Sequence, residues 1–355
     1  GAQATPCTRQ LSWSDSGLLA ISLTDQIYIW DSDTHEAHHV HALSPSHGVL
    51  TCISWPAGSS HLTFSDSLGT TSFLDVERGK VTAFDASHGR KPTKHSVTSH
   101  GWNGNSLAVG TSDGFVSFLD QRCAKWTRTF KCTDSQNSVS ALAFHPSPSS
   151  HLIAVGTASC LQTENFSSGS ELEGIERHTR TYSANNVPVH ERDKTVNLYD
   201  TRYLRKFVDS KSFVASLRTG SSTNALLWHP KNASSLIAGG HNGVVTTWDT
   251  ARGVPMTRRA TGRAISALAA SAEYAELMTA HYGFPYKKDC FQQLHLWSLN
   301  SLFPIIPFGQ FEDQVQPSHQ ITGVLDAARS QCGEHVCALT SDESLKFWKV
   351  FPRSE

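Results

Sequence analysis

A short stretch of alternating apolar residues recurs along the chain, and each copy ends in a large apolar residue that is usually followed by Asp. The copies end at Trp30–Asp31, Leu74–Asp75, Leu119–Asp120, Tyr199–Asp200, Trp248–Asp249, Trp297–Ser298 and Trp348–Lys349. The steps between successive copies are 44, 45, 80, 49, 49 and 51 residues. A regular period of this length indicates a repeat architecture, in which each unit buries its apolar faces against its neighbours.

Each copy is preceded by further short apolar stretches separated by turn residues, as in LSWSDSGLLAISL from Leu11. Alternation over four to eight residues predicts a strand that is half-buried. Short strands that repeat every 40–45 residues or so and end in an aromatic–Asp pair are typical of WD-repeat β-propellers. The 80-residue step carries one such set, so it counts as one blade with an insertion. We therefore predict an all-β, seven-bladed WD-repeat β-propeller.

The predicted propeller is a single domain over residues 1–355. The blades are expected near residues 11–34, 49–79, 96–134, 138–211, 223–257, 264–311 and 319–350. The insertion, residues 159–193 in blade 4, is polar and has too few large apolar residues to order itself. It is expected to be a tolerated mobile loop or, alternatively, a loop that binds a partner. Gly1–Gln10 is expected to supply the outer fourth strand of blade 7 and so to close the ring.

Composition excludes some classes of partner. The formal net charge is −1 and the pI is about 7.1, so no global field attracts nucleic acid or an anionic membrane, and neither is expected as a partner. No apolar run approaches the roughly 20 residues that cross a bilayer. The eight cysteines are scattered without a CxxC pair, which favours reduced thiols in the nucleus and cytoplasm.

The sequence carries no recognisable catalytic set. The motifs GxSxG, GxxxxGK[ST], GxGxxG and HExxH are absent, so we expect neither an enzyme nor a cofactor. One histidine-rich stretch contains His35, His38, His39, His41 and His47. It is expected to be a solvated hairpin and, as the alternative, a metal-binding tract.

Several polar residues are expected to have structural roles. Asp342 with Trp348 (and His319), and His95 with Asp113, are expected to form buried hydrogen-bonded networks, since buried polar groups need partners.

Several longer stretches are more specific than a generic repeat. They are LSWSDSGLLAISLTDQIYIWDSDT in blade 1, WNGNSLAVGTSDG in blade 3, AELMTAHYGFPYKKDCFQQLHLWSL in blade 6 and TSDESLKFWKVFP in blade 7. Together they resemble the propeller of the fizzy and fizzy-related family, the WD-repeat activators of the anaphase-promoting complex. The likeness covers essentially the whole chain, and one divergent branch that it could represent is that of the meiosis-specific activators.

The resemblance implies a substrate receptor that binds degron peptides for a ubiquitin ligase. Its partners would be ligase core subunits and degron-bearing substrate or inhibitor proteins. A destruction-box peptide would bind between blades 1 and 7, at Leu11, Ser12, Trp13, Asp342 and Glu343. Glu343 would meet the Arg of the peptide, whereas Ser12 stands where the family has a second carboxylate.

The resemblance also implies a second contact at the centre of the upper face. The matching positions are His241, Asn242, Gln292, Gln293 and Gln320. Gln320 replaces the family's Arg, and Gln292–Gln293 replaces its Asn–Gln pair. These departures argue against recognition of a KEN-type peptide.

Two alternatives remain open from the residues. The Asp-x-Arg endings at Asp120–Arg122 and Asp200–Arg202 also occur in WD-repeat substrate receptors of cullin-type ubiquitin ligases. A protein-interaction scaffold unrelated to ubiquitin is the other alternative, because a propeller without a catalytic site is usually a platform for other proteins.

Overall fold

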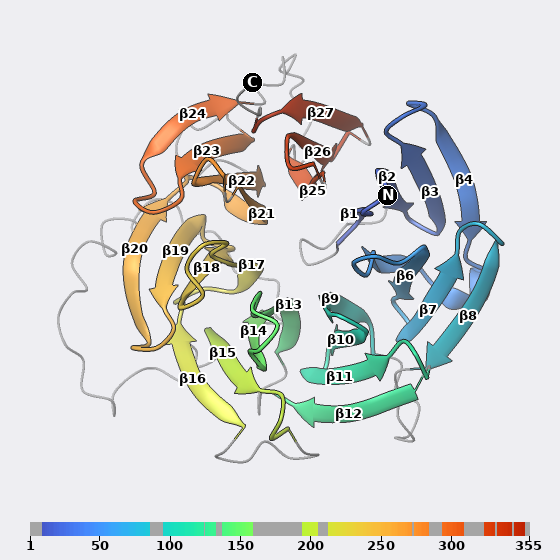
Figure 1. The fold of residues 1–355 in the computed structure, drawn as a ribbon, viewed down its shortest axis with the longest axis horizontal. Helices are drawn as coiled ribbons and strands as arrows, with labels where there is room; N and C mark the ends of the chain where they lie inside the picture. The colour runs from blue at the N-terminus through green and yellow to red at the C-terminus, as the bar shows by residue number, and fades with distance from the viewer. Residues whose placement is uncertain are drawn as a thin grey trace.

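The computed structural model describes residues 9–85, 95–123, 125–132, 137–158, 194–204, 212–271, 273–283, 293–308, 323–330, 332–342 and 344–351. These residues form seven antiparallel sheets around a ring, and the last sheet lies beside the first (Figure 1). The predicted all-β, seven-bladed propeller is therefore confirmed. Within the described residues, no helix is long and apolar enough to cross a membrane.

Each blade is a meander whose strands follow one another from the centre of the ring to its rim. Blade 1 consists of β1 (Leu11–Trp13), β2 (Leu18–Leu23), β3 (Gln26–Asp31) and β4 (Ala37–Ala42). Blade 2 follows a short 3-10 helix, η1 (Pro45–His47), and consists of β5 (Leu50–Ser54), β6 (His61–Asp66), β7 (Thr70–Asp75) and β8 (Lys80–Asp85). Blade 3 consists of β9 (Val97–Asn103), β10 (Ser106–Thr111), β11 (Phe115–Asp120) and β12 (Lys125–Lys131).

The remaining blades repeat this order. Blade 4 consists of β13 (Ser138–Phe144), β14 (Leu152–Ala158), β15 (Thr195–Asp200) and β16 (Phe213–Arg218). Blade 5 consists of β17 (Thr223–Trp228), β18 (Ser235–Gly240), β19 (Val244–Asp249) and β20 (Val254–Ala260). Blade 6 consists of β21 (Ala264–Ser271), β22 (Glu276–Tyr282), β23 (Leu294–Ser298) and β24 (Pro304–Phe308). Blade 7 consists of β25 (Val324–Arg329), β26 (His335–Thr340) and β27 (Leu345–Lys349).

The core is divided among the junctions between blades. A cluster of buried apolar side chains lies at each of the seven junctions, including the one between blades 7 and 1. Strand alternation explains this arrangement, because one face of each sheet points to the preceding blade and the other face to the next. Both faces of the inner strands are therefore apolar. Removing these faces from water stabilises the fold.

The inner strands carry a bulge that joins neighbouring blades. The register with the second strand shifts at Thr98 in blade 3, at Ser140 in blade 4 and at Asn224 in blade 5. Each bulged side chain donates to a carbonyl of the next blade: Thr98 to Val139, Ser140 to Thr223, and Asn224 to Ile265. These bonds satisfy buried polar groups and fix the spacing of the blades.

The ring closes at the inner strands of blades 7 and 1. The buried Asp326 carboxylate of β25 accepts hydrogen bonds from the backbone N–H groups of Gln10 (2.8 Å) and Leu11 (3.0 Å). Arg9 forms a parallel bridge with Cys52 of blade 2. The prediction that this segment forms the outer strand of blade 7 is therefore wrong for Arg9 and Gln10. A buried carboxylate needs hydrogen-bond donors, and the backbone N–H groups of Gln10 and Leu11 supply them near the centre of the ring. The remaining residues of the segment, 1–8, lie outside the described residues.

The insertion in blade 4 follows β14 and precedes β15, the second and third strands of that blade. Its residues 159–193 lie outside the described part of the chain.

Candidate functional site at the junction of blades 1 and 7

Three aromatic side chains meet at the junction of blades 1 and 7, and we call them the aromatic shelf: Trp13, Trp30 and Phe347. The Trp30 and Phe347 ring centroids lie 4.5 Å apart, and Trp13 packs edge-on to Trp30 at 5.7 Å and to Phe347 at 6.5 Å. The two tryptophans are half-buried, and Phe347 is 39% exposed. Exposed aromatic surface of this kind is typical of a place where another chain binds.

Strand alternation decides which residues of β1 reach the shelf. Leu11 and Trp13 share one face and join the apolar cluster with blade 7. Ser12 points to the other face, where its hydroxyl accepts a hydrogen bond from the Trp55 N–H of blade 2 at 3.0 Å. The structure therefore brings Leu11 and Trp13 to the junction with blade 7 and places Ser12 toward blade 2.

A depression of about 350 Å³ extends the shelf at the turns that follow β1 and β25. It is lined by Trp13, Asp15, Arg329 and Ser330. The Arg329 side chain is anchored there by hydrogen bonds to the Ala270 carbonyl (2.8 Å) and the Gly333 carbonyl (3.0 Å), and burial lowers the pKa of its guanidinium.

A thiol of unusual acidity lies next to this depression. Cys332 is exposed, and its sulfur lies 3.1 Å from the Ser330 hydroxyl and 3.8 Å from Nδ1 of His335. Partial burial opposes ionisation, but hydrogen bonds from Ser330, His335 and the Glu334 backbone prevail and lower the pKa of the thiol to about 7. Hydrogen bonds to the thiolate stabilise the charged form.

Asp342 lies at the opposite end of the same blade, in the turn between β26 and β27. Its carboxylate accepts hydrogen bonds from the Thr340 hydroxyl and from the Ser344 hydroxyl (2.8 Å), and its side chain is 62% exposed. Burial of part of the group opposes ionisation, but these bonds hold the pKa of Asp342 below its usual value. Lys346 of β27 also lies 4.0 Å from the Asp342 carboxylate. Because Asp342 is exposed, the expectation that it belongs to a buried network is wrong. Glu343 and His319 are outside the described residues.

The two ends of blade 7 are separated by the length of a strand. Thr340 pairs with Val324 at the Asp342 end, and Val336 pairs with Arg329 at the other. Four residue steps at about 3.3 Å each put the two ends roughly 13 Å apart. Asp342 and the depression beside Trp13 therefore lie at opposite ends of blade 7, and Phe347 pairs with Cys337 between these ends.

The residues predicted for the centre of the upper face lie on blades 5 and 6. Nδ1 of His241 lies 2.7 Å from the Tyr282 hydroxyl, and Asn242 accepts hydrogen bonds from the Ser221 hydroxyl (2.9 Å) and the Val244 N–H (3.2 Å). Gln293 is buried, while Gln292 and Gln320 are outside the described residues. The structure therefore joins His241 to Tyr282, which sequence reasoning missed.

Two buried histidine networks were also missed. His100 bridges the hydroxyls of Ser54 (2.9 Å) and Ser65 (2.7 Å), and the Trp102 indole donates to Ser54. In blade 6, Nε2 of His281 lies 2.7 Å from the Thr279 hydroxyl, which accepts from the Trp297 indole.

A sequence signal for these networks does exist. His100 and Trp102, like Thr279 and His281, are two residues apart and so share a strand face. His95 Nε2 lies 3.5 Å from Asp113 Oδ2, so the expected pair forms, but neither side chain is buried and the expectation of a buried network is wrong there.

The histidine-rich stretch forms most of β4, the outer strand of blade 1. His38 lies 3.6 Å from Glu36, the His39 ring packs on Tyr28, and the His41 ring packs on Phe64. Among the described residues, no three His, Cys, Asp or Glu side chains gather in a way that could hold a metal ion.

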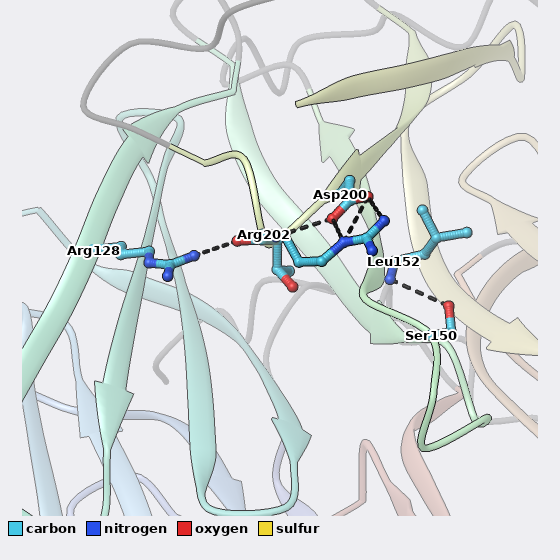
Figure 2. Close-up of polar contacts among 6 residues, drawn as sticks. Arg128, Ser150, Leu152, Asp200 and Arg202 are labelled. Carbon is cyan, nitrogen blue, oxygen red and sulfur yellow. Dashed lines mark hydrogen bonds and ion pairs between the residues drawn. The ribbon is translucent and has the colours of Figure 1, made fainter. Parts of the chain in front are cut away.

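The two Asp-x-Arg endings form matching ion pairs on neighbouring blades. Arg202 folds back on Asp200, with Nη2 2.6 Å from Oδ2, and Arg122 does the same to Asp120 at 2.9 Å. Hydrogen bonds from each arginine lower the pKa of its Asp partner. Arg128 reaches across from blade 3 and donates to the Thr201 carbonyl beside this pair (Figure 2).

Comparison with known proteins gives relatives along almost the whole chain. No family model matches. A protein of Arabidopsis thaliana described as cell division cycle 20.1, cofactor of APC complex, is 23% identical over 351 residues, which cover 96% of this chain and 63% of the relative. The anaphase-promoting complex subunit cdh1 of Dictyostelium discoideum is 22% identical over 97% of this chain and 42% of the relative. The APC/C activator protein CDH1 of Saccharomyces cerevisiae is 22% identical over 97% of this chain and 49% of the relative.

A solved structure supports the fold independently. A chain in the crystal structure of a mitotic checkpoint complex superposes with a TM-score of 0.74 at 20% sequence identity, covering 98% of this chain and 89% of that one. Both the repeat pattern and this superposition define the protein as a WD-repeat β-propeller. The resemblance to the fizzy and fizzy-related family, activators of the anaphase-promoting complex, is confirmed over 96% of the chain at 21–24% identity. The chain spans about two-fifths to two-thirds of the length of these curated relatives.

Proposed function

We propose that this propeller is the substrate-recognition module of an activator of the anaphase-promoting complex, and that it binds destruction-box-like peptides at the junction of blades 1 and 7. The observation that carries the proposal is the similarity to such activators over 96% of the chain. Ligase core subunits and degron-bearing substrates or inhibitors are the proposed partners. The proposed location is the nucleus and cytoplasm, and the proposed role involves neither catalysis nor a cofactor.

The dimensions of the junction suit an extended Arg-x-x-Leu segment. Three residue steps separate its Arg from its Leu, or about 10 Å in an extended chain. This matches the separation between the Asp342 turn and Phe347, which pairs with Cys337 further along the blade. The Leu side chain would lie on the aromatic shelf, whose exposed ring area it covers, while the Arg would lie at the acidic turn.

The acidic turn differs from its equivalent in blade 3 at one position. Thr111-Ser-Asp-Gly114 of blade 3 corresponds to Thr340-Ser-Asp-Glu343 of blade 7. Thr111 donates to Asp113 as Thr340 donates to Asp342, so the turn framework is shared. A carboxylate at position 343 therefore replaces a glycine that the same turn uses elsewhere. Two neighbouring carboxylates favour a guanidinium through charge-assisted hydrogen bonds.

The upper-face residues supply a second proposed contact. By residue type, His241, Asn242, Gln292, Gln293 and Gln320 are amides and an imidazole, with no carboxylate among them. Such groups suit a neutral polar or acidic stretch of the peptide better than a cationic one.

Titration of a labelled Arg-x-x-Leu peptide tests the proposal. Glu343→Gly converts the turn to the sequence of blade 3 and should weaken binding about tenfold or more, since a charge-assisted contact contributes about 1.5–3 kcal/mol. Phe347→Ser should weaken binding by a similar factor through loss of the shelf. Gly114→Glu, the reciprocal change in blade 3, should leave the affinity within twofold. Equal affinity of all four proteins would place the peptide elsewhere.

The ligase itself is identified by co-purification. The exposed Asp-x-Arg pairs on blades 3 and 4 favour a second candidate, a receptor of a cullin-type ligase. In that case Arg122→Ala with Arg202→Ala should abolish capture of the cullin adaptor, whereas capture of the anaphase-promoting complex with the wild type supports the first proposal. A scaffold unrelated to ubiquitin would capture neither ligase and would not bind the peptide.

A further inference from the structure

Exposed apolar side chains are concentrated on one side of the rim. Among the residues that the structure describes, ten large apolar residues are exposed, and seven of them belong to blades 4, 5 and 6: Tyr203, Phe213, Val214, Val254, Met256, Phe303 and Ile305. Phe303 is the most exposed, at 61%. Clustered apolar surface of this kind marks an interaction site more often than single exposed residues do.

The densest part of this surface lies where the outer strand of blade 5 meets the outer strand of blade 6. Arg259 of β20 lies over the ring of Phe303, which precedes β24, with 5.1 Å between the guanidinium carbon and the ring centroid. The two strands follow one another along the rim (Figure 1). We call this surface the 5/6 ledge, and it comprises Val254, Met256, Arg259, Phe303 and Ile305.

The ledge is positively charged in a chain that is nearly neutral. Residues 250–260 and 299–308 contain three arginines and no carboxylate. Arg252 pairs with Asp249 at the start of the strand. Arg258 pairs with Thr246 and faces blade 4, where its guanidinium lies beside Gly220. No carboxylate of the described residues forms an ion pair with Arg259. The ledge therefore lacks a negative charge to balance this guanidinium group.

The stacking of Arg259 on Phe303 prepares the guanidinium for a carboxylate. A guanidinium that lies over an aromatic ring uses its face, so the N–H donors at its edge stay available for a planar, bidentate partner. The apolar residues on either side add area that only a partner with apolar side chains would cover.

The edge of the sheet favours an extended partner. β20 is the last strand of its sheet, so one side of its main chain is open to pairing with an added strand. Pro255 lacks an N–H near the beginning of the strand, which leaves Met256–Ala260 as the part suited to such pairing.

We propose that the 5/6 ledge binds an extended acidic peptide whose carboxylates alternate with aliphatic side chains and which adds a strand to β20. A second copy of this chain fits poorly, because a two-fold contact would bring Arg259 against its own copy. Aliphatic Val254, Met256 and Ile305 offer no stacking platform for bases, which disfavours a nucleic acid. This site is separate from the junction of blades 1 and 7 and does not depend on the function proposed for it.

A peptide selection with a built-in subtraction tests the proposal. A displayed library of random 12-residue peptides is selected on the wild-type protein after removal of every clone that binds Arg259→Glu. We expect enriched peptides with two or more Asp or Glu residues interleaved with aliphatic ones. Their affinity, measured by fluorescence anisotropy, should fall at least tenfold with Arg259→Glu and at least fivefold with Phe303→Ser.

Two controls define the ledge. Arg78→Glu, at an exposed arginine on blade 2, should leave the affinity of the selected peptides within twofold. Binding of the Arg-x-x-Leu peptide should be unchanged in Arg259→Glu, which separates the two sites. Failure to enrich any subtracted peptide, enrichment of peptides without acidic residues, or capture of anionic phosphatidylserine vesicles that Arg259→Glu abolishes would overturn the proposal.

Discussion

Two junctions of the ring differ in how many of their apolar residues are buried: the junction of blades 4 and 5 and the junction of blades 7 and 1. The first has ten buried apolar residues, among them Trp228 and Trp248, and two that are partly buried. The second has five buried and five partly buried, and its tryptophans belong to the partly buried group. The junction of blades 7 and 1 therefore leaves more of its aromatic area exposed to solvent than the junction of blades 4 and 5 does.

The hydrogen bonds that join the blades also differ between the two junctions. Blades 4 and 5 are joined by the Ser140 hydroxyl at a strand bulge, a short neutral contact within a continuous chain. Blades 7 and 1 come from opposite ends of the sequence and are joined by the Asp326 carboxylate, which accepts two backbone N–H groups. One buried carboxyl group thus accepts two backbone N–H groups at the junction with less apolar burial.

The largest difference is expected in the response to truncated side chains. Leu236→Ala, at a fully buried position of the 4/5 junction, should lower the free energy of unfolding by about 2–5 kcal/mol. Phe347→Ala should cost about 1 kcal/mol or less, because the ring is already partly hydrated. Denaturation in urea, followed by tryptophan fluorescence, measures both. A larger loss for Phe347→Ala would show that the 7/1 junction is as tightly packed as the other.

The pH dependence of stability should also differ between the junction of blades 2 and 3, which contains His100, and the junction of blades 7 and 1, which contains Asp326. Burial lowers the pKa of His100, between blades 2 and 3, to about 3. Its stabilising contribution is therefore complete above pH 6.5 and is lost as the pH falls from 6.5 toward 3. His100→Gln should flatten the melting temperature across that window relative to the wild type. An unchanged slope would mean that His100 is not buried in its neutral form.

Asp326 should change the stability of the fold with pH in the direction opposite to that of His100. Burial raises the pKa of its carboxyl group, so its contribution is complete at low pH and decreases as the pH rises through the raised pKa. Asp326→Asn removes this titration, and Asp326→Ala leaves the Gln10 and Leu11 N–H groups without an acceptor, at about 1–3 kcal/mol. Thermal melts of the three proteins between pH 4 and pH 8 measure the effect. Equal stability of Asp326→Ala and the wild type would show that the carboxylate does not fasten the ring.

The fold could be predicted because the repeat is visible in residue types. Strand endings such as Trp248–Asp249 recur, and alternation fixes which residues are buried. The outer strands were harder to predict, because β4 (AHHVHA) and β20 (VPMTRRA) are largely exposed and show no regular apolar alternation. Exposed edge strands experience little selection for a buried face, so their pattern is weak.

The site could be predicted only in part. Trp13 and Asp342 were placed on the correct blades from sequence, since the motifs around them are local. Ser12 points toward blade 2, where its hydroxyl accepts a hydrogen bond from the backbone N–H of Trp55, 43 residues away. The Arg329 guanidinium is held by the carbonyl of Ala270 in another blade. Contacts between blades come from the closed ring and leave no local signal.

A small, local effect is expected at Cys332 beside the depression. With a thiol pKa of about 7, Cys332 should react with iodoacetamide at half its maximal rate near pH 7. Cys52 and Cys132, whose pKa values burial raises to about 12, should react only after unfolding. Mass spectrometry of alkylated peptides measures this. Bound Arg-x-x-Leu peptide should slow the reaction, because it covers the shelf next to the depression.

We propose above that an Arg-x-x-Leu peptide binds at the junction of blades 7 and 1. An Arg-x-x-Leu peptide that carries a photo-reactive group in place of its Leu side chain tests this most directly, with the cross-linked residues mapped by mass spectrometry. The account predicts cross-links to Trp13, Trp30 or Phe347, and their loss in the presence of excess unlabelled peptide. Competed cross-links confined to blades 4, 5 or 6 would contradict it.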